Sequence, residues 1–248
     1  MKKICNTAIA LLIFLLLSGI TSCKTEEEFT THWETFSIDV ENHFDEVRNT
    51  ILQKTGKVEA DNDEGYDFCK YTVSADSSIT ASSINNISLQ NIGYNVCGFE
   101  GRFKCENPES TPVGEYGFLL NVNLDESSFY MISFTPQGTI VIYHYGGGTG
   151  KEPIKAEMTE IAQILSTSES NPIKDKTISN TIKVETVSEN QINIYINDRL
   201  VYELKGLASN NKRGTLGFFQ MMNIEKETIF MRGTPMVSKY QITKLQRY

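Results

Sequence analysis

The sequence is poor in the residue types that most often carry out catalysis. Its 248 residues include only one tryptophan and three histidines, and they contain no Gly-x-Ser-x-Gly motif that would mark a hydrolase nucleophile. The histidines are His32, His43 and His144. We expect His32 in a flexible tether near the N-terminus, His43 at the surface, and His144 half-buried on a strand. The sequence therefore predicts no catalytic triad and offers no residue as a catalytic group.

Positive charge is also scarce, with 23 basic residues against 31 acidic ones and a formal net charge of −8. A nucleic acid backbone demands clustered Lys and Arg side chains, and no such run occurs. We therefore expect no nucleic acid partner.

The first 22 residues have the parts of a cleaved secretion signal. Lys2 and Lys3 precede an apolar run over 8–17, which is short for a membrane span. Ile20-Thr-Ser-Cys23 then resembles the lipobox of bacterial lipoproteins, which implies cleavage before Cys23 and attachment of diacylglycerol to its thiol. The alternative is an ordinary signal peptide followed by a chance cysteine. The expectation is a lipoprotein signal peptide over 1–22 and a lipid anchor at Cys23.

The acidic residues that follow Cys23 bear on location. Lys24-Thr-Glu-Glu-Glu28 resembles the export signal of lipoproteins displayed on the outer face of the outer membrane, although a solvated acidic linker facing the periplasm would look the same. We expect a lipidated tether over 23–35 and a cell-surface location on the outer membrane. Removing 1–22 takes away two lysines, which leaves 21 basic and 31 acidic residues and a net charge of −10.

Three cysteines remain in the body of the mature chain, because Cys5 is removed with the signal and Cys23 is acylated. Interpreted as one strand, residues 94–105 place Cys97 and Cys105 on the same apolar face, about 26 Å apart at about 3.3 Å per residue. They cannot pair unless the strand folds back at a glycine. Buried free thiols are the favoured interpretation, with Cys69 bonding one of them as the alternative.

Alternating apolar residues predict strand after strand. A two-residue hairpin loop is expected at Asn197-Asp198, since both residues tolerate positive φ, and one short helix is expected where Met158, Ile161, Ala162 and Leu165 share a face. The expected strands lie in 117–123, 129–134, 139–145, 182–184, 192–196, 200–204, 216–218 and 240–242. This pattern predicts an all-β, two-sheet antiparallel jelly-roll sandwich over residues 36–248, with at most one or two short helices.

Six segments of the sequence have a recognisable pattern of strands and turns: 44–49, 115–119, 129–138, 180–185, 190–202 and 214–218. With Phe44-Asp-Glu-Val-Arg-Asn49 as the opening motif and Gly214-Thr-Leu-Gly-Phe218 after the hairpin, they resemble concanavalin A-like lectin/glucanase domains, the laminin-G-like jelly rolls. The matching positions are turns and core faces, so the resemblance implies the fold more than a function. Asp198 stands where the family's hairpin usually has glycine, and a tryptophan often found after the opening motif is absent.

Hydrolysis is one implication of the resemblance. Glucanases of this fold carry Glu-x-Asp-x-x-Glu on a strand, and the nearest match is Glu59-Ala-Asp-Asn-Asp-Glu64. Its polar spacers and the following Gly65 favour a solvated loop. Asp61 and Asp63 are weak candidates for calcium, so we expect no metal or other cofactor. Related domains proposed to hydrolyse 3-keto-disaccharides provide a second enzymatic alternative.

A non-catalytic binding module is the favoured function, because sugar sites combine aromatic faces with amide and carboxylate groups. The alternative for each tyrosine is that it covers the sandwich without binding anything. The expected partners are the membrane, through the lipid, and a polysaccharide, an oligosaccharide or another cell-envelope component; a scaffold lipoprotein contacting envelope proteins without a small ligand is a further alternative. The candidate ligand-binding residues are Asn121, Tyr143, Tyr145, Asn193 and Tyr195.

Overall fold

The computed structural model describes residues 32–35, 45–46, 56–73, 87–108, 114–123, 128–146, 157–175, 178–207, 214–221 and 236–247. For 45–46, 56–58, 73, 87–95, 157 and 221 only the backbone is described. The predicted signal peptide, Cys23 and His43 lie outside the described residues. None of the described residues forms a helix of the length and hydrophobicity needed to cross a membrane.

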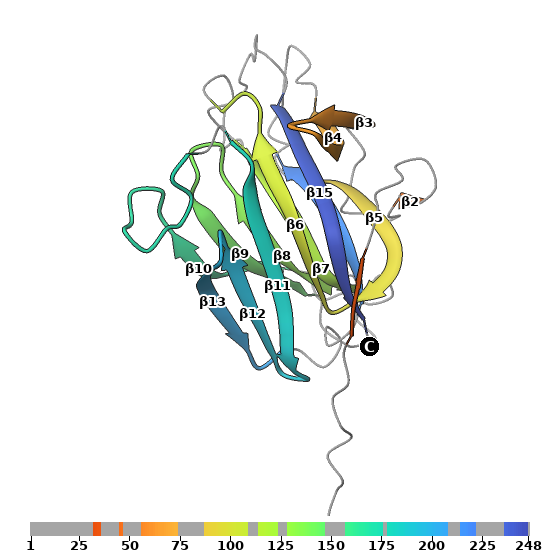
Figure 1. Cartoon of the computed structure of the whole chain (residues 1–248). Coiled ribbons are helices and arrows are strands. Elements are labelled where there is room, and N and C mark those ends of the chain that lie inside the picture. The colour runs from red at the N-terminus through yellow and green to blue at the C-terminus, as the bar shows by residue number, and fades with distance from the viewer. Residues whose placement is uncertain are drawn as a thin grey trace, which may run out of the picture. The chain divides into compact units, whose positions relative to one another are not determined.

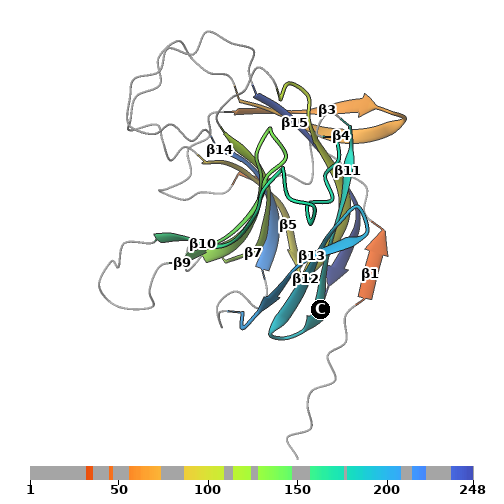
Figure 2. The same cartoon turned by 90° about the vertical axis from the view of Figure 1, so that its left-hand side faces the viewer.

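Two antiparallel sheets pack face to face, as Figure 1 and Figure 2 show from two directions. Sheet A has the order β13-β12-β11-β6-β15-β4-β3, with β1 also paired to β15. Its strands are β1 (His32–Thr35), β3 (Gly56–Asp63), β4 (Tyr66–Val73), β6 (Gly98–Cys105), β11 (Asn180–Ser188), β12 (Gln191–Ile196), β13 (Arg199–Lys205) and β15 (Met236–Arg247).

Sheet B has the order β10-β9-β8-β7-β14-β5-β2. Its strands are β2 (Asp45–Glu46), β5 (Ile87–Val96), β7 (Glu115–Asn123), β8 (Ser128–Phe134), β9 (Ile140–Gly146), β10 (Glu157–Ile164) and β14 (Gly214–Met221). Every pairing within the two sheets is antiparallel.

Aromatic side chains join the sheets across the interior. Phe103 of β6 stacks on Phe134 of β8 with ring centroids 3.9 Å apart, and Tyr240 of β15 stacks on Phe218 of β14 at 4.8 Å. All four are fully buried. Such pairs add about 0.5–1.5 kcal/mol each beyond the burial of their area, so they fix how one sheet faces the other.

The hairpin of β12 and β13 agrees with the sequence prediction. Asn197 and Asp198 have φ of 48° and 61°, and Ile196 pairs directly with Arg199, which makes a two-residue loop with positive φ at both positions. Ile192, Ile194 and Ile196 are all buried in the core. The alternation in β12 therefore sets which face of sheet A is internal.

The helix predicted around Met158 is wrong, because residues 157–164 form strand β10, paired with β9. A register shift between Glu160 and Ala162 interrupts the strand alternation. Met158 therefore packs on the outer side of sheet B, while Ile161 and Ala162 pack on the core between the sheets. The resulting apolar spacing resembles that of a helix.

The single strand predicted over residues 94–105 is also wrong. The chain ends β5 of sheet B at Val96 and begins β6 of sheet A at Gly98, with Cys97 between them. A side chain at Gly98 would collide with Gln246 and with the Val184 carbonyl, so glycine is needed there. Cys69, Cys97 and Cys105 are nevertheless free and buried, as predicted, and the alternative disulfide with Cys69 is not formed.

Two boundaries differ from the sequence prediction. Residues 32–35 pair with β15, so the last part of the expected 23–35 tether is strand β1 and the sandwich begins before residue 36. Residues 59–63, expected in a loop, belong to β3, whose backbone pairs with β4 up to a turn at Glu64-Gly65. In both places backbone pairing determines the structure despite polar side chains.

Candidate functional site

A groove of about 290 Å³ opens on the outer face of sheet A. Three neighbouring strands form its floor. Arg102 of β6 lies at the centre, because it pairs with Thr181 of β11 on one side and with Gln241 of β15 on the other. The lining residues are Tyr66, Glu100, Gly101, Arg102, Thr181, Ile182, Lys183, Asp198, Gln241 and Thr243. Since alternation sends Phe99 and Phe103 into the core, the intervening Glu100 and Arg102 side chains point outward.

An arginine stacked on a tyrosine forms one side of this groove. The guanidinium carbon of Arg102 lies 3.8 Å from the centre of the Tyr66 ring. A guanidinium over an aromatic face is held in a plane by cation–π attraction while its N–H edges stay available. Tyr66 itself is 40% exposed, so it offers aromatic surface to a ligand.

Polar and aromatic residues continue from the groove along the same face. The Lys183 ammonium lies 5.6 Å from the Trp33 ring centre and 5.7 Å from that of Tyr195. The amide of Asn193 donates to the Tyr195 hydroxyl at 3.2 Å. The predicted ligand residues Asn193 and Tyr195 therefore lie beside the groove, half-buried on the outer face of sheet A.

The hairpin of β3 and β4 is fastened to this face by buried lysines. Lys239 contacts Asp61 at 2.7 Å and Asp63 at 3.0 Å, and Lys104 binds Asp63 and Glu64. These hydrogen bonds and charges lower the pKa of Asp63 to about 2. Asp61 and Asp63, the weak calcium candidates, are thus bound to lysines, and in the described parts of the chain no group of three or more His, Cys, Asp or Glu suits a metal.

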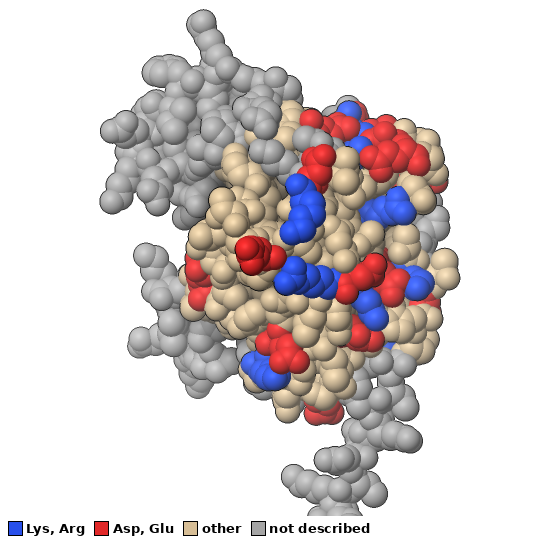
Figure 3. Space-filling view, turned by 60° about the vertical axis from the view of Figure 1, so that its left-hand side comes forward, with Lys and Arg blue, Asp and Glu red and all other residues tan. Residues whose placement is uncertain are grey.

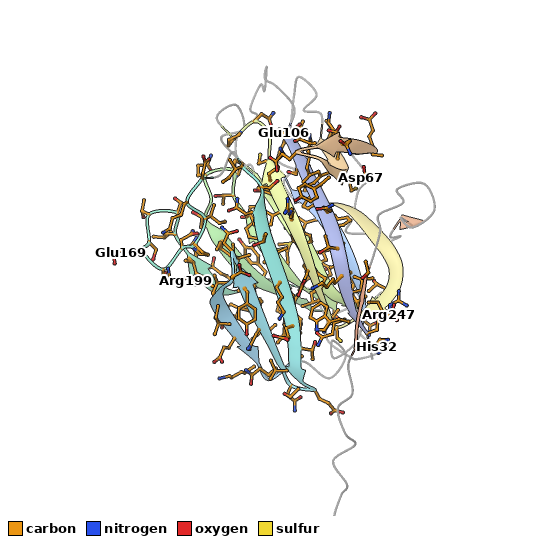
Figure 4. The ribbon with its side chains drawn as sticks, in the orientation of Figure 1. His32, Asp67, Glu106, Glu169, Arg199 and Arg247 are labelled. Atoms are coloured by element: carbon orange, nitrogen blue, oxygen red, sulfur yellow. The ribbon has the colours of Figure 1, made fainter. Side chains whose placement is uncertain are left out.

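Charges of both signs lie close together on the molecular surface drawn in Figure 3, where Lys and Arg alternate with Asp and Glu. In Figure 4, Asp67 and Glu106 mark the end of the sandwich that carries the β3–β4 hairpin, while His32 and Arg247 lie at the opposite end of β15. Glu106 also contacts Lys239, at 2.5 Å. Lys239 thus joins Glu106 to the carboxylates of the β3–β4 hairpin at this end of the sandwich.

The other three predicted ligand residues lie on sheet B and are separate from this groove. Asn121 is fully buried, at a register shift of β7 where its φ is 53°, and Tyr145 is 5% exposed and stacked on Phe129 at 4.9 Å. Both are therefore buried, and neither presents a surface to a ligand as a binding residue would. Tyr143 is half-buried, and its hydroxyl donates to Glu115 at 3.1 Å.

Glu115 is a buried carboxyl on the outer face of sheet B. Its oxygens accept hydrogen bonds from Ser133 and Tyr143. Burial raises the pKa of Glu115 despite these hydrogen bonds, and the nearby Glu160 charge raises it further. This carboxyl has both oxygens engaged, so it serves as a buried structural group.

Comparisons with known proteins identify the fold. No family model matches the sequence, and no curated protein is significantly similar to it. Solved structures do match: a Bacillus licheniformis β-glucanase has 10% sequence identity and a TM-score of 0.51, covering 90% of this chain and all of that one. A Bacteroides ovatus glycoside hydrolase family 16 protein, solved with a mixed-linkage glucan product, has 12% identity and the same TM-score, covering 88% and 96%. A lichenase from a mouse hindgut metagenome has 12% identity and TM-score 0.51, covering 88% and 99%.

The chain has the jelly-roll fold of concanavalin A-like domains. The predicted fold class and the stated resemblance are thereby confirmed. At these identities the likeness concerns the arrangement of strands. The ligands of this jelly roll therefore depend on its own side chains and not on its fold.

Sequence reasoning missed the residues that form the groove of this jelly roll. Tyr66 follows the segment 59–64, which was predicted to be a solvated loop. Trp33, which lies near Lys183 beside the groove, was assigned to the tether. The alternation that places Cys97 and Cys105 on the apolar face of residues 94–105 places Arg102 on the polar face, but it does not distinguish Arg102 from Glu100 or Lys104. The distinguishing feature is spatial: Tyr66 reaches Arg102 only through the β3–β4 hairpin.

Proposed function

We propose that this protein is a lipoprotein, anchored at the cell surface through Cys23, whose jelly roll binds carbohydrate without catalysis in the groove on sheet A. The observation that carries this proposal is the groove itself. It combines an exposed aromatic ring, Tyr66, with amide, hydroxyl and charged groups of three strands in about 290 Å³. Aromatic surface with a few placed polar groups is the usual composition of a sugar site.

The similar structures support a carbohydrate-related role, since one of them is solved with a glucan product bound. The lipobox-like Ile20–Cys23 and the acidic residues after it support anchoring and surface display. A membrane-anchored sandwich with a polar groove suits a protein that holds a polysaccharide, or another glycan of the envelope, near the cell.

Binding is favoured over hydrolysis by the contacts and positions of the groove carboxylates. A glycosidase needs two carboxyl groups that act together on either side of the scissile bond. In this groove Glu100 is held in an ion pair with the Lys244 ammonium, at 2.7 Å, and Asp198 lies in the exposed turn between β12 and β13. The groove therefore holds two carboxylates suited to accepting hydroxyl hydrogens.

The test is glycan-array binding by the mature chain carrying Cys23→Ser, followed by titration calorimetry with each glycan that binds. Residues 31–248 form one compact unit, so removal of the lipid leaves the sandwich whole. Tyr66→Ala and Asp198→Asn should each weaken binding about tenfold, as expected for loss of a stacking ring or a charged hydrogen-bond partner. Leu165→Ala, at an exposed position following β10, is the matched control and should leave affinity unchanged.

Two outcomes would contradict the proposal. If no glycan binds, or if binding ignores both groove variants, the sugar site is not here and a scaffold role becomes the better account. Turnover of a chromogenic glycoside panel by the same preparation, lost in Glu100→Gln or Asp198→Asn, would show that the groove is catalytic.

A further inference from the structure

The groove contains an arginine whose charge is not neutralised. Arg102 makes no hydrogen bond or ion pair through its guanidinium with any other described residue, and its contact is the Tyr66 ring. The other two described arginines differ: Arg199 donates to the Glu169 carbonyl at 3.1 Å, and Arg247 pairs with Glu34 at 3.1 Å. Figure 4 labels Arg199, Glu169 and Arg247, which lie at the margins of the sandwich.

The neighbouring lysines on this face are neutralised by carboxylates. Lys244 lies 2.7 Å from Glu100, Lys183 lies 3.3 Å from Glu185, and Lys104 and Lys239 bind the carboxylates of the β3–β4 hairpin. A guanidinium presents five N–H donors in a planar fork, which matches two oxygens of one carboxylate or sulfate. Arg102 is thus an oriented and unused binder of an oxyanion.

Hydrogen-bond acceptors lie in the same groove, but they form no hydrogen bond or ion pair with the Arg102 guanidinium. Asp198 lines it and forms no ion pair with Arg102, so the two opposite charges are more than 4.0 Å apart. The side-chain oxygen of Gln241, directly beside Arg102 on β15, is buried and accepts no hydrogen bond from the described part of the chain. A buried acceptor left without a donor costs stability, which a ligand donor would restore.

We propose that this groove selects an anionic sugar, with its carboxylate or sulfate on Arg102 and its hydroxyl groups on Asp198 and Gln241. This inference rests on the proposed carbohydrate function and adds the charge of the sugar to it. Arg102 is positively charged and Asp198 is negatively charged, and both line the same groove. A ligand that contacts both residues therefore needs an oxyanion and hydroxyl donors within one small unit. The volume, at the lower end of the range for ligand pockets, suits about one sugar unit at a time.

The surroundings disfavour a densely charged polyanion. Asp198 and Glu100 line the same groove, and the mature chain is acidic overall. A ligand with several charges per sugar would meet these carboxylates, whereas one with a single oxyanion can place it on Arg102 alone. The geometry therefore favours one negative charge per sugar unit.

The experiment is titration calorimetry of the mature chain carrying Cys23→Ser with four probes. These are trigalacturonate, its methyl ester, a monosulfated galactose trisaccharide and neutral cellotriose. Trigalacturonate or the sulfated probe should bind at least about tenfold more tightly than the uncharged probes, as for gain of one charge-assisted forked contact. The carboxylate and sulfate probes show which oxyanion is the natural one.

Three variants assign this preference to the groove. Arg102→Gln should abolish the preference for the charged probe, and Arg102→Lys should restore only part of it, because an ammonium keeps the charge but loses the fork. Arg247→Gln, which removes the same charge from the far end of β15, is the control and should leave the preference intact. Far-ultraviolet circular dichroism of each variant verifies that the sandwich is folded.

The outcomes separate this inference from the general function. If the uncharged probes bind as tightly as the charged ones, and Tyr66→Ala weakens both, carbohydrate binding stands and the anionic preference is wrong. A preference that persists in Arg102→Gln, or that Arg247→Gln also abolishes, contradicts the assignment to Arg102. If none of the four probes binds while the array finds other glycans, the anionic preference is likewise wrong. Failure to bind any glycan overturns both proposals.

Discussion

Ile194, in the middle of β12, provides the sharpest test of the sandwich geometry. It is 1% exposed, and it pairs with Val184 of β11 on one side and with Tyr202 of β13 on the other. Ile194→Ala removes three carbon atoms from the core. Because β12 is hydrogen-bonded on both sides, the backbone cannot move inward to fill the cavity.

The expected cost therefore lies in the upper half of the range for such truncations, about 3–5 kcal/mol. For a chain of this length each kcal/mol lowers the melting temperature by about 2–4 °C, which predicts a drop of roughly 6–20 °C. Ile194→Val keeps most of the volume and should cost only about 0.5–1.5 kcal/mol.

Asn193→Ala, one residue away, is the matched control. Asn193 faces outward, and its side-chain hydrogen bonds with described residues join it to Tyr195 at 3.2 Å and to Gln191 at 3.0 Å. Half-exposed bonds of this kind contribute about 1 kcal/mol or less. Thermal and urea unfolding of the three variants, followed by circular dichroism, gives the order directly. Equal destabilisation by Ile194→Ala and Asn193→Ala, or the reverse order, would refute the assignment of the two faces.

Three further predictions concern the cysteines and Glu115. Cys23→Ser should move the protein from the membrane fraction to a soluble or unprocessed form, and unchanged fractionation with normal processing would exclude lipid anchoring. In this variant Cys69, Cys97 and Cys105 should resist a thiol reagent until urea is added, since burial raises the pKa of Cys69 to about 12, and a Cys97–Cys105 crosslink in peptide maps would contradict their free state. Because the pKa of Glu115 is raised in the folded chain, its stabilising effect is present below the ordinary carboxyl pKa and is lost as pH rises through the folded value. Glu115→Gln should thus raise the melting temperature at about pH 8 but not at about pH 4, and a gain that is equal at both values would contradict this role.

Most of this fold could be predicted from the sequence, because the alternation of apolar and polar residues indicates the strands and the residue types between them indicate the turns. Ile192, Ile194 and Ile196 specify a face by themselves, and Asn197-Asp198 specifies a two-residue turn. Prediction failed where an irregularity changes the period. The register shift between Glu160 and Ala162 produced a helical spacing in a strand.

The candidate site was less predictable, for a different physical reason. Asn193 and Tyr195 were found on the outer face because they alternate with core residues. Asn121 and Tyr145 follow equally plausible patterns but are buried on the second face of sheet B. Alternation assigns a residue to one side of a sheet, whereas exposure depends on what packs against that side.

The three outward charges of β6 show how one strand pattern produces different roles. Glu100 is paired with Lys244, and Lys104 is bound by the carboxylates of Asp63 and Glu64. Arg102, between them, meets only the Tyr66 ring among the described residues. All three occupy outward positions on the strand, and each follows or precedes one inward aromatic residue, Phe99 or Phe103. Their difference arises from β3, β4 and β15, which supply partners to the two outer charges and an aromatic surface to the central one, so the binding capacity of this face is a product of tertiary structure.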